Sequence, residues 1–296
     1  KLEILHQQIQ TSPSEDKKNT KKGLALSEKR KRLAEKKKSK KRKVQGLSSG
    51  AAPSPDQINH LLEHYQADRL VEFEALATSL TQQFPKHPVG WKALGIALKQ
   101  TGRLAESLVP MQSAVALSPQ DADAHSNLGN TLKALGRLDE SEASYRQATA
   151  LKPDFAEAHN NLGAILRELG RLEEAEASYR QAVALKPDFA EAHNNLGLIL
   201  KKLRRFDESE ASYKKAIALK LGYAEAHCNL GNTLQELGRL NEAEVSYNQA
   251  IALKPDYADA HSNLGIMLKE LGRLDEAEAS YTQAIALKPD DSIAKH

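Results

Sequence analysis

A glycine recurs every 34 residues along most of this chain, and the residues around it recur with it. The glycines occupy the same place in each copy: Gly95, Gly129, Gly163, Gly197, Gly231 and Gly265. A fixed period of this length is the signature of a repeat array, in which each unit packs only against its neighbours. The core of such a chain grows along one axis, so its length does not call for separate globular domains.

Each copy predicts two amphipathic helices. In the copy from Phe155 to Pro187, apolar residues fall at helical spacing in two runs, namely Leu162, Ile165, Leu166 and Leu169, then Leu172, Ala175, Tyr179, Ala182, Val183 and Leu185. Gly170 separates the runs, where a helix end favours left-handed backbone angles, and Pro187 stops the second helix. We therefore expect helix-turn-helix units.

Acidic residues at the unit boundaries predict how the first helices begin. Three spacings resemble capping boxes: Asp154 with Glu157, Asp188 with Glu191, and Asp256 with Asp259. In a capping box, side-chain oxygens accept hydrogen bonds from the amides that the first turn of a helix leaves unpaired.

Several other residues recur around each glycine. The alanines are Ala148, Ala182, Ala216, Ala250 and Ala284, the tyrosines are Tyr145, Tyr179, Tyr213, Tyr247 and Tyr281, and the prolines are Pro119, Pro153, Pro187, Pro255 and Pro289. Together with the period and the Leu-Gly pairs, they resemble the tetratricopeptide repeat (TPR) family. The HNNLG blocks at 159–163 and 193–197 look most like the repeats of O-linked N-acetylglucosamine transferase and of bacterial TPR-transferase fusions.

This resemblance implies an all-α, right-handed superhelical solenoid whose concave face is lined by the first helix of each unit. It predicts six units, at 88–121, 122–155, 156–189, 190–223, 224–257 and 258–291, after a divergent helix pair at 54–87. Residues 292–296 then form the start of a truncated next helix, so we expect a fragment of a longer protein.

The N-terminal residues 1–53 differ from the array in composition. Residues 1–50 hold 16 Lys and Arg against 5 Asp and Glu, which leaves 26 and 34 of the chain totals of 42 and 39 for the rest. With few apolar residues and no aromatic one, this segment predicts a disordered, lysine-rich arm and linker. Three interpretations are open: a solvated tail, charge-driven contact of residues 17–43 with nucleic acid or an anionic membrane, and a nuclear import signal at Lys36–Val44.

The cysteine count and the lack of a long apolar run indicate where the protein is located. Cys228 is the single cysteine, which excludes an internal disulfide bond and favours a reducing compartment. No apolar run approaches the roughly 20 residues of a transmembrane helix. We expect a cytoplasmic protein, nuclear only if the chain is eukaryotic and Lys36–Val44 acts as an import signal.

An asparagine row is the strongest functional feature. It comprises Asn127, Asn161, Asn195, Asn229 and Asn263, each two residues before the repeated glycine. In TPR proteins this row faces the concave groove, and an amide can hold a peptide backbone through paired hydrogen bonds. The resemblance thus implies an asparagine ladder that binds an extended peptide. The alternative is that these side chains are solvated or bond to the next helix.

Charged residues flank the asparagine row on both sides. Asp123, Glu157, Glu191, Glu225 and Asp259 form an acidic edge, and Lys133, Arg167, Lys201 and Lys269 form a basic edge. We include Lys133, Arg167 and Lys201 with the asparagines as candidate peptide-binding residues. Acids at helix starts and bases at helix ends also suit the helix dipole without any ligand.

Other rows have structural explanations. His125, His159, His193, His227 and His261 recur once per unit, but packed helices lie about 8 to 10 Å apart, too far for shared zinc coordination. Trp91 occupies the equivalent place in its unit, which favours a packing role. We find no catalytic constellation, phosphate-binding loop or dinucleotide motif, and we predict no metal, no cofactor and no enzyme activity in the chain as given.

Two functions remain open. The chain is either a non-catalytic scaffold that binds a protein or peptide in the concave groove, or the substrate-recruiting arm of a larger glycosyl-, sulfo- or methyltransferase. The unit at 190–223 departs from the pattern, since Arg204 replaces the interhelix glycine and Leu221-Gly222 replaces Pro-Asp. We expect this unit to be a weak point of the array.

Overall fold

A computed structural model describes residues 52–288. These residues form fourteen α-helices and no strand. The helices are α3 (Pro55–Gln66), α4 (Leu70–Gln83), α5 (Pro88–Gln100), α6 (Leu104–Leu117), α7 (Ala122–Ala134), α8 (Leu138–Leu151), α9 (Ala156–Glu168), α10 (Leu172–Leu185), α11 (Ala190–Lys202), α12 (Phe206–Leu219), α13 (Ala224–Glu236), α14 (Leu240–Leu253), α15 (Ala258–Glu270) and α16 (Leu274–Leu287). The expected all-α array is confirmed. The predicted basic arm, apart from its last residues, and the predicted helix start at 292–296 lie outside the described range.

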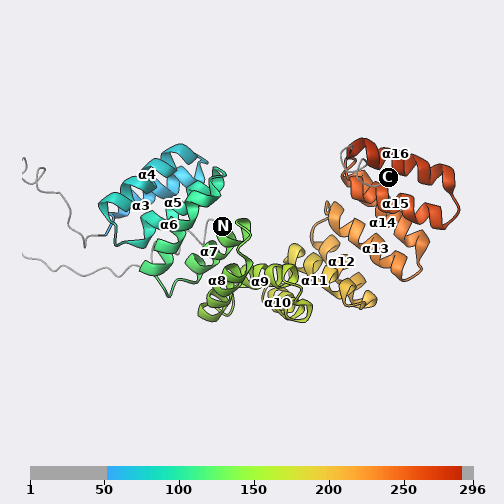
Figure 1. The fold of residues 1–296 in the computed structure, drawn as a ribbon, viewed down its shortest axis with the longest axis horizontal. Coiled ribbons are helices and arrows are strands. Elements are labelled where there is room, and N and C mark those ends of the chain that lie inside the picture. The colour runs from blue at the N-terminus through green and yellow to red at the C-terminus, as the bar shows by residue number, and fades with distance from the viewer. Residues whose placement is uncertain (1–51, 289–296) are drawn as a thin grey trace, which may run out of the picture. The chain divides into compact units, whose positions relative to one another are not determined.

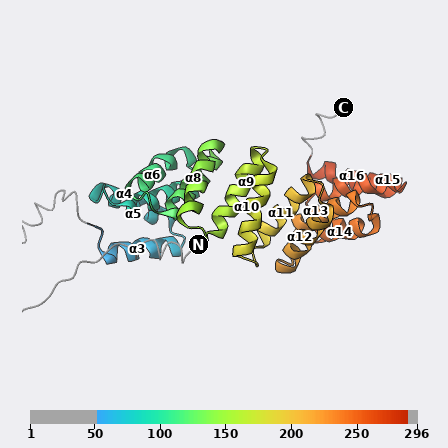
Figure 2. The ribbon, with the colours of Figure 1, turned by 90° about the horizontal axis from the view of Figure 1, so that it is seen from below.

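The chain divides into two compact parts, one ending at Arg137 and the other beginning at Leu138. In the N-terminal part, α3 to α7 pack consecutively, and α5 also contacts α7. In the C-terminal part, α8 to α16 pack consecutively in a row of stacked helix hairpins (Figures 1 and 2). There the first helices also touch one another, α9 with α11, α11 with α13, and α13 with α15. We call the surface formed by these four helices the first-helix face.

The repeated glycine and tyrosine explain the close pairing within each hairpin. Tyr179 of α10 is fully buried, and a Cβ atom added to Gly163 of α9 would lie 2.9 Å from its ring. The same contact would be 2.8 Å between Gly197 and Tyr213. Because real Cβ atoms do not approach a buried ring so closely, glycine is needed where the two helices meet. Leu162, Ile165, Leu166, Ala175 and Ala182 are buried around this contact, as their helical spacing predicted.

The turn inside each hairpin uses a left-handed residue. Gly170 has φ +77°, and an added Cβ there would meet no atom within 4 Å, so its backbone angle alone explains the glycine. At the same place in the next unit, Arg204 has φ +60°, and Asp68 in the first helix pair has φ +53°. A residue with a Cβ atom is strained in this conformation.

The predicted capping boxes were wrong. The helices α9, α11 and α15 begin after Phe155, Phe189 and Tyr257, and none of these helix starts has a side-chain capping bond. The preceding aspartate lies one residue too early and uses its backbone instead, since the Asp154 carbonyl accepts from Ala156 N at 3.0 Å. The aromatic ring lies under a lysine, with Lys152 Nζ 4.9 Å from the Phe155 ring centroid.

Side-chain caps occur in the N-terminal part instead. Asp121 caps α7 by accepting from the amides of Asp123 and Ala124, both at 3.0 Å, and its carboxylate also pairs with Lys92. Ser54 and Gln57 form a capping box at the start of α3. These caps occur where no aromatic residue separates the polar side chain from the helix.

Candidate functional site

The asparagine row of the C-terminal part lies between adjacent first helices. Asn195 Nδ2 donates to Asn160 Oδ1 of the preceding unit at 3.0 Å, and Asn229 Nδ2 donates to Asn194 Oδ1 at 3.2 Å. The accepting residues Asn160 and Asn194 are buried, whereas Asn195 and Asn229 are half-buried. One N–H of Asn195 and one N–H of Asn229 therefore tie neighbouring units together.

The ends of the row differ from its middle. Asn263 Nδ2 lies 3.6 Å from Cys228 Sγ, because cysteine stands where the neighbouring units have asparagine. Asn161 Oδ1 lies 3.5 Å from Asn160 Nδ2 of its own helix. Asn127 lies half-buried on α7 in the N-terminal part and is described with that part alone. The structure thus brings four of the five row asparagines onto one face.

The basic candidates lie in the last turn of their first helices. Lys133 lies on α7, Arg167 on α9 and Lys201 on α11, and all three are half-buried. Burial lowers the pKa of Lys201, and the carboxylate of Glu236 on α13 opposes this shift in part. Lys201 is therefore a partly desolvated cation next to the following unit.

The acidic edge is partly neutralised by lysines. Glu157 Oε1 accepts from Lys186 Nζ at 3.0 Å, and Asp259 Oδ1 accepts from Lys288 Nζ at 2.8 Å. Glu225 Oε1 lies 3.4 Å from Asn194 Nδ2. These carboxylates belong to first turns, so they also face the positive end of the helix dipole.

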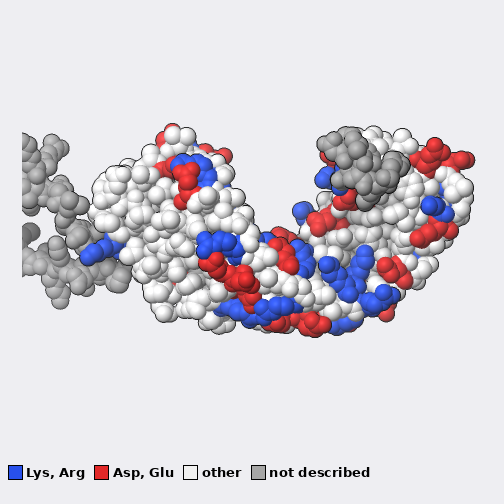
Figure 3. Space-filling view, viewed as in Figure 1, with Lys and Arg blue, Asp and Glu red and all other residues white. Residues whose placement is uncertain are grey.

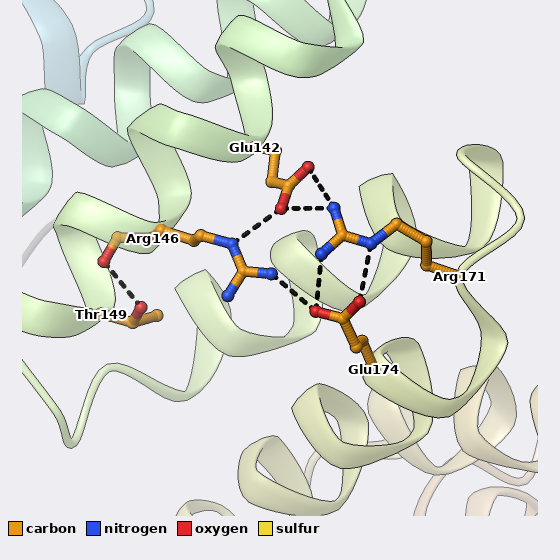
Figure 4. Close-up of polar contacts among 5 residues, drawn as sticks. All are labelled: Glu142, Arg146, Thr149, Arg171 and Glu174. Atoms are coloured by element: carbon orange, nitrogen blue, oxygen red, sulfur yellow. Dashed lines mark hydrogen bonds and ion pairs between the residues drawn. The ribbon is translucent and has the colours of Figure 1, made fainter.

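Sequence reasoning missed a network of ion pairs that joins the second helices. Arg171 Nη1 donates to Glu142 Oε1 at 2.7 Å, its Nη2 donates to Glu174 Oε2 at 2.6 Å, and Arg146 bonds to both carboxylates (Figure 4). Arg205 joins Glu176 and Glu208 in the same way, and Arg239 joins Glu210 and Glu242. The signal was an arginine that follows the interhelix turn and has a glutamate three residues later. In every unit except that of Arg137, a second glutamate stands 29 residues earlier.

The histidine row has a structural partner. The Nε2 atoms of His125, His159, His193 and His261 each lie 3.0 Å from a backbone carbonyl oxygen, that of the proline six residues earlier. Trp91 Nε1 donates to Pro85 O at 2.9 Å, which confirms that tryptophan plays the same packing role. Within residues 52–288, no three His, Cys, Asp or Glu side chains gather as metal ligands.

Two family models of the same repeat match this chain. A "TPR repeat" model matches residues 129–167, 163–203 and 236–272, and a "Tetratricopeptide repeat" model matches 190–220 and 258–291. Together these segments span half of the chain. The chain is a tetratricopeptide repeat protein.

Several solved structures share the fold. A chain of the APC/C hetero-tetramer Cut9–Hcn1 has a TM-score of 0.65 and 18% identity over 79% of this chain and 46% of its own length. MamA has a TM-score of 0.51 and 25% identity over 57% of this chain and 98% of its own. YrrB, described as a TPR protein with an unusual peptide-binding site, has a TM-score of 0.51 and 24% identity over 62% of this chain and 95% of its own.

These comparisons show the TPR fold, and the expected resemblance to a transferase stays a prediction. The matched part spans under half of the Cut9–Hcn1 chain. A search of curated proteins gave no match. No helix between residues 52 and 288 of this TPR protein has the length and apolar character to cross a membrane.

Proposed function

We propose that this TPR protein is an interaction scaffold that holds an extended peptide of a partner protein across the first-helix face of its C-terminal part. The observation that carries the proposal is the row of half-buried amides formed by Asn161, Asn195 and Asn229. The bonds between units use one N–H of Asn195 and of Asn229. An asparagine side chain has a second N–H and a carbonyl oxygen with two lone pairs, so each rung keeps a donor and an acceptor for a peptide backbone.

The spacing of the rungs suits an extended peptide. Packed helices lie about 8 to 10 Å apart, and an extended chain advances about 3.3 Å per residue, so one rung meets every third peptide residue. Such contacts bond to backbone groups, which every sequence carries. YrrB, which shares the fold, is described as having a peptide-binding site. TPR arrays are typically non-catalytic scaffolds, and a row of amides that bonds to a peptide backbone fits that role.

The test compares two alanine variants that break the same hydrogen bond from opposite sides. Asn195→Ala removes a half-buried amide that would contact the peptide, whereas Asn160→Ala removes its buried partner. We expect Asn195→Ala to weaken binding of a random-sequence peptide library about tenfold, while Asn160→Ala leaves binding within about twofold. Fluorescence anisotropy measures the binding, and circular dichroism checks that both variants stay helical.

Equal loss of binding in the two variants would mean that the bond between units matters and that the row does not hold peptide. The pair Asn229→Ala and Asn194→Ala repeats the comparison one unit later. The cytoplasmic location, the role of residues 17–43 and the link to a transferase stay predictions.

A further inference from the structure

The unit at 190–223 is basic between acidic neighbours. It holds 7 Lys and Arg against 4 Asp and Glu, whereas 156–189 holds 4 against 6 and 224–257 holds 2 against 5. Three substitutions to basic residues account for most of the difference from 156–189. Lys202 replaces a glutamate found at 168, 236 and 270, Arg204 replaces an interhelix glycine, and Lys215 replaces a glutamine found at 181, 249 and 283.

In another unit, the residue equivalent to Lys202 is a glutamate that forms a hydrogen bond with the preceding unit. Gln235 Nε2 of α13 donates to Glu270 Oε2 of α15 at 2.9 Å, and one unit earlier the nearby Glu236 carboxylate partly opposes the lowering of the Lys201 pKa by burial. By the same register, one more unit toward the N-terminus, Arg167 corresponds to Gln235 and Lys202 to Glu270, so we expect these two cations to lie side by side. At the other interfaces the same positions bring a carboxylate to an amide or an ammonium.

Within residues 52–288, Arg167 and Lys202 form no ion pair, although the arginines of the second helices each bond to two glutamates. Arg167 is half-buried and Lys202 is exposed. Like charges at adjacent positions repel, and an anion placed between them removes that repulsion.

Arg204 adds a third cation two residues after Lys202. Its side chain is exposed, and its guanidinium carbon lies 5.4 Å from the Phe206 ring centroid. Arg204 keeps a left-handed backbone, with φ +60°, that the neighbouring units give to glycine. Strained residues of this kind cluster at functional sites, and here the strain places a guanidinium in contact with solvent.

We propose that Arg167, Lys202 and Arg204 form a binding site for the acidic side chains of the partner peptide. This inference rests on the proposed function, because it assigns a charge preference to the peptide held by the asparagine row. Two adjacent carboxylates would each receive charge-assisted hydrogen bonds, Arg204 offering a two-pronged donor and Lys202 a single one.

An acidic peptide fits this site better than a nucleic acid does. The site holds three cations, and the flanking units are net negative. Over the face of the C-terminal part drawn in Figure 3, Lys and Arg side chains are interspersed with Asp and Glu. A nucleic-acid strand needs a continuous basic track for its phosphates, which this surface does not provide.

The experiment uses the full chain and two peptide probes that carry a net-neutral dye. One probe is a triple repeat of Ser-Glu-Gly-Glu, and the other is its glutamine counterpart. We expect the unchanged protein to bind the glutamate probe about tenfold more tightly by fluorescence anisotropy. The double variant Lys202→Glu with Arg204→Gly restores the residues of the neighbouring units, so it should fold and lose this preference.

Two further measurements separate the site from the basic N-terminal arm. Lys215→Gln removes the same charge at the other end of the hairpin, near His193, and should keep the preference. Zero-length carbodiimide coupling joins a carboxylate to a lysine that it touches, and mass spectrometry should find the glutamate probe on Lys202 and not on Lys215.

The outcomes are distinct for the two proposals. Equal binding of the two probes, loss of preference in Lys215→Gln, or coupling confined to the arm overturns the acidic site and leaves the asparagine row standing. Tighter binding of a 12-residue oligothymidine that competes for Lys202 overturns it in favour of nucleic acid. If neither probe binds, the acidic site is overturned. The library test with Asn195→Ala then shows whether the asparagine row holds peptide.

Discussion

Arg204 shows at the scale of one residue how an exception to the repeat is tolerated. Its φ of +60° matches the glycines of the neighbouring hairpin turns, whose values lie between +71° and +78°. Left-handed angles cost a residue with a Cβ atom roughly 1 to 2 kcal/mol. The strain persists because the helices on both sides fix the turn.

We predict that Arg204→Gly stabilises the protein by about 1 kcal/mol, because glycine adopts this conformation without strain. Urea unfolding followed by circular dichroism measures the change. Gly170→Ala is the matched control, since its φ is +77° and an added Cβ meets nothing within 4 Å. It should destabilise the protein by a similar amount. A destabilised Arg204→Gly variant would show that the contact with Phe206 outweighs the backbone strain.

At the scale of the elements, the second helices are held together by charge. Hydrogen bonds from Arg171 and then Arg146 lower the pKa of Glu174, and those from Arg205 and Arg180 lower that of Glu208. Burial raises the pKa of Glu142, but the combined hydrogen bonds from Arg146 and Arg171 leave it lowered. A carboxyl with a lowered folded pKa stabilises the fold above its unfolded value of 4.5 and stops doing so as pH falls through the folded value.

We therefore predict that the melting temperature is flat from about pH 7 to pH 5 and falls as the pH drops below 4.5. Glu174→Gln should make this fall shallower, because the paired carboxyl that protonates is gone. Glu173→Gln is the control, since within the described residues Glu173 forms no ion pair. Equal pH profiles for the two variants would show that the exposed pairs contribute little.

At the scale of the whole molecule, we expect local stability to vary along the array. The expected weak point at 190–223 rested partly on Leu221-Gly222, which replaces the Pro-Asp pair. That part was wrong, because the replaced aspartate would not have capped the next helix. Asp188 provides no side-chain cap in the preceding boundary, and Gly222 O accepts from Ala224 N at 3.1 Å much as Asp188 O accepts from Ala190 N at 3.0 Å. Two features do differ. Arg204 has a strained backbone, and within residues 52–288 the His227 ring lacks the hydrogen bond to a backbone carbonyl oxygen that His193 makes.

We predict that amides in α11 and α12 exchange hydrogen about fivefold faster than those in α9 and α10, since about 1 kcal/mol of strain is released on local opening. Hydrogen exchange with mass spectrometry measures the ratio. In Arg204→Gly the difference should shrink. Equal protection of the two units in the unchanged protein would dispose of the weak point.

The helices and their pairing were predictable from the sequence because they depend on local patterns. The spacing of Leu162, Ile165 and Leu166 marks a buried helical face, and Gly163 with Tyr179 marks a close contact inside one hairpin. Helix starts were less predictable, because Phe155 moves the boundary away from Asp154. The sequence showed that the asparagines recur once per unit, but it did not show which side chains they bond to.

The sequence by itself determined the period, the helix pairs and the residues that repeat along them, since each follows from spacing within about 34 residues. Only the tertiary structure decided which side chains meet across units. The rise and rotation between stacked hairpins place Asn195 against Asn160 and Arg171 against Glu142. Those contacts depend on stacking geometry, which is set by the whole packed interface and by no single motif.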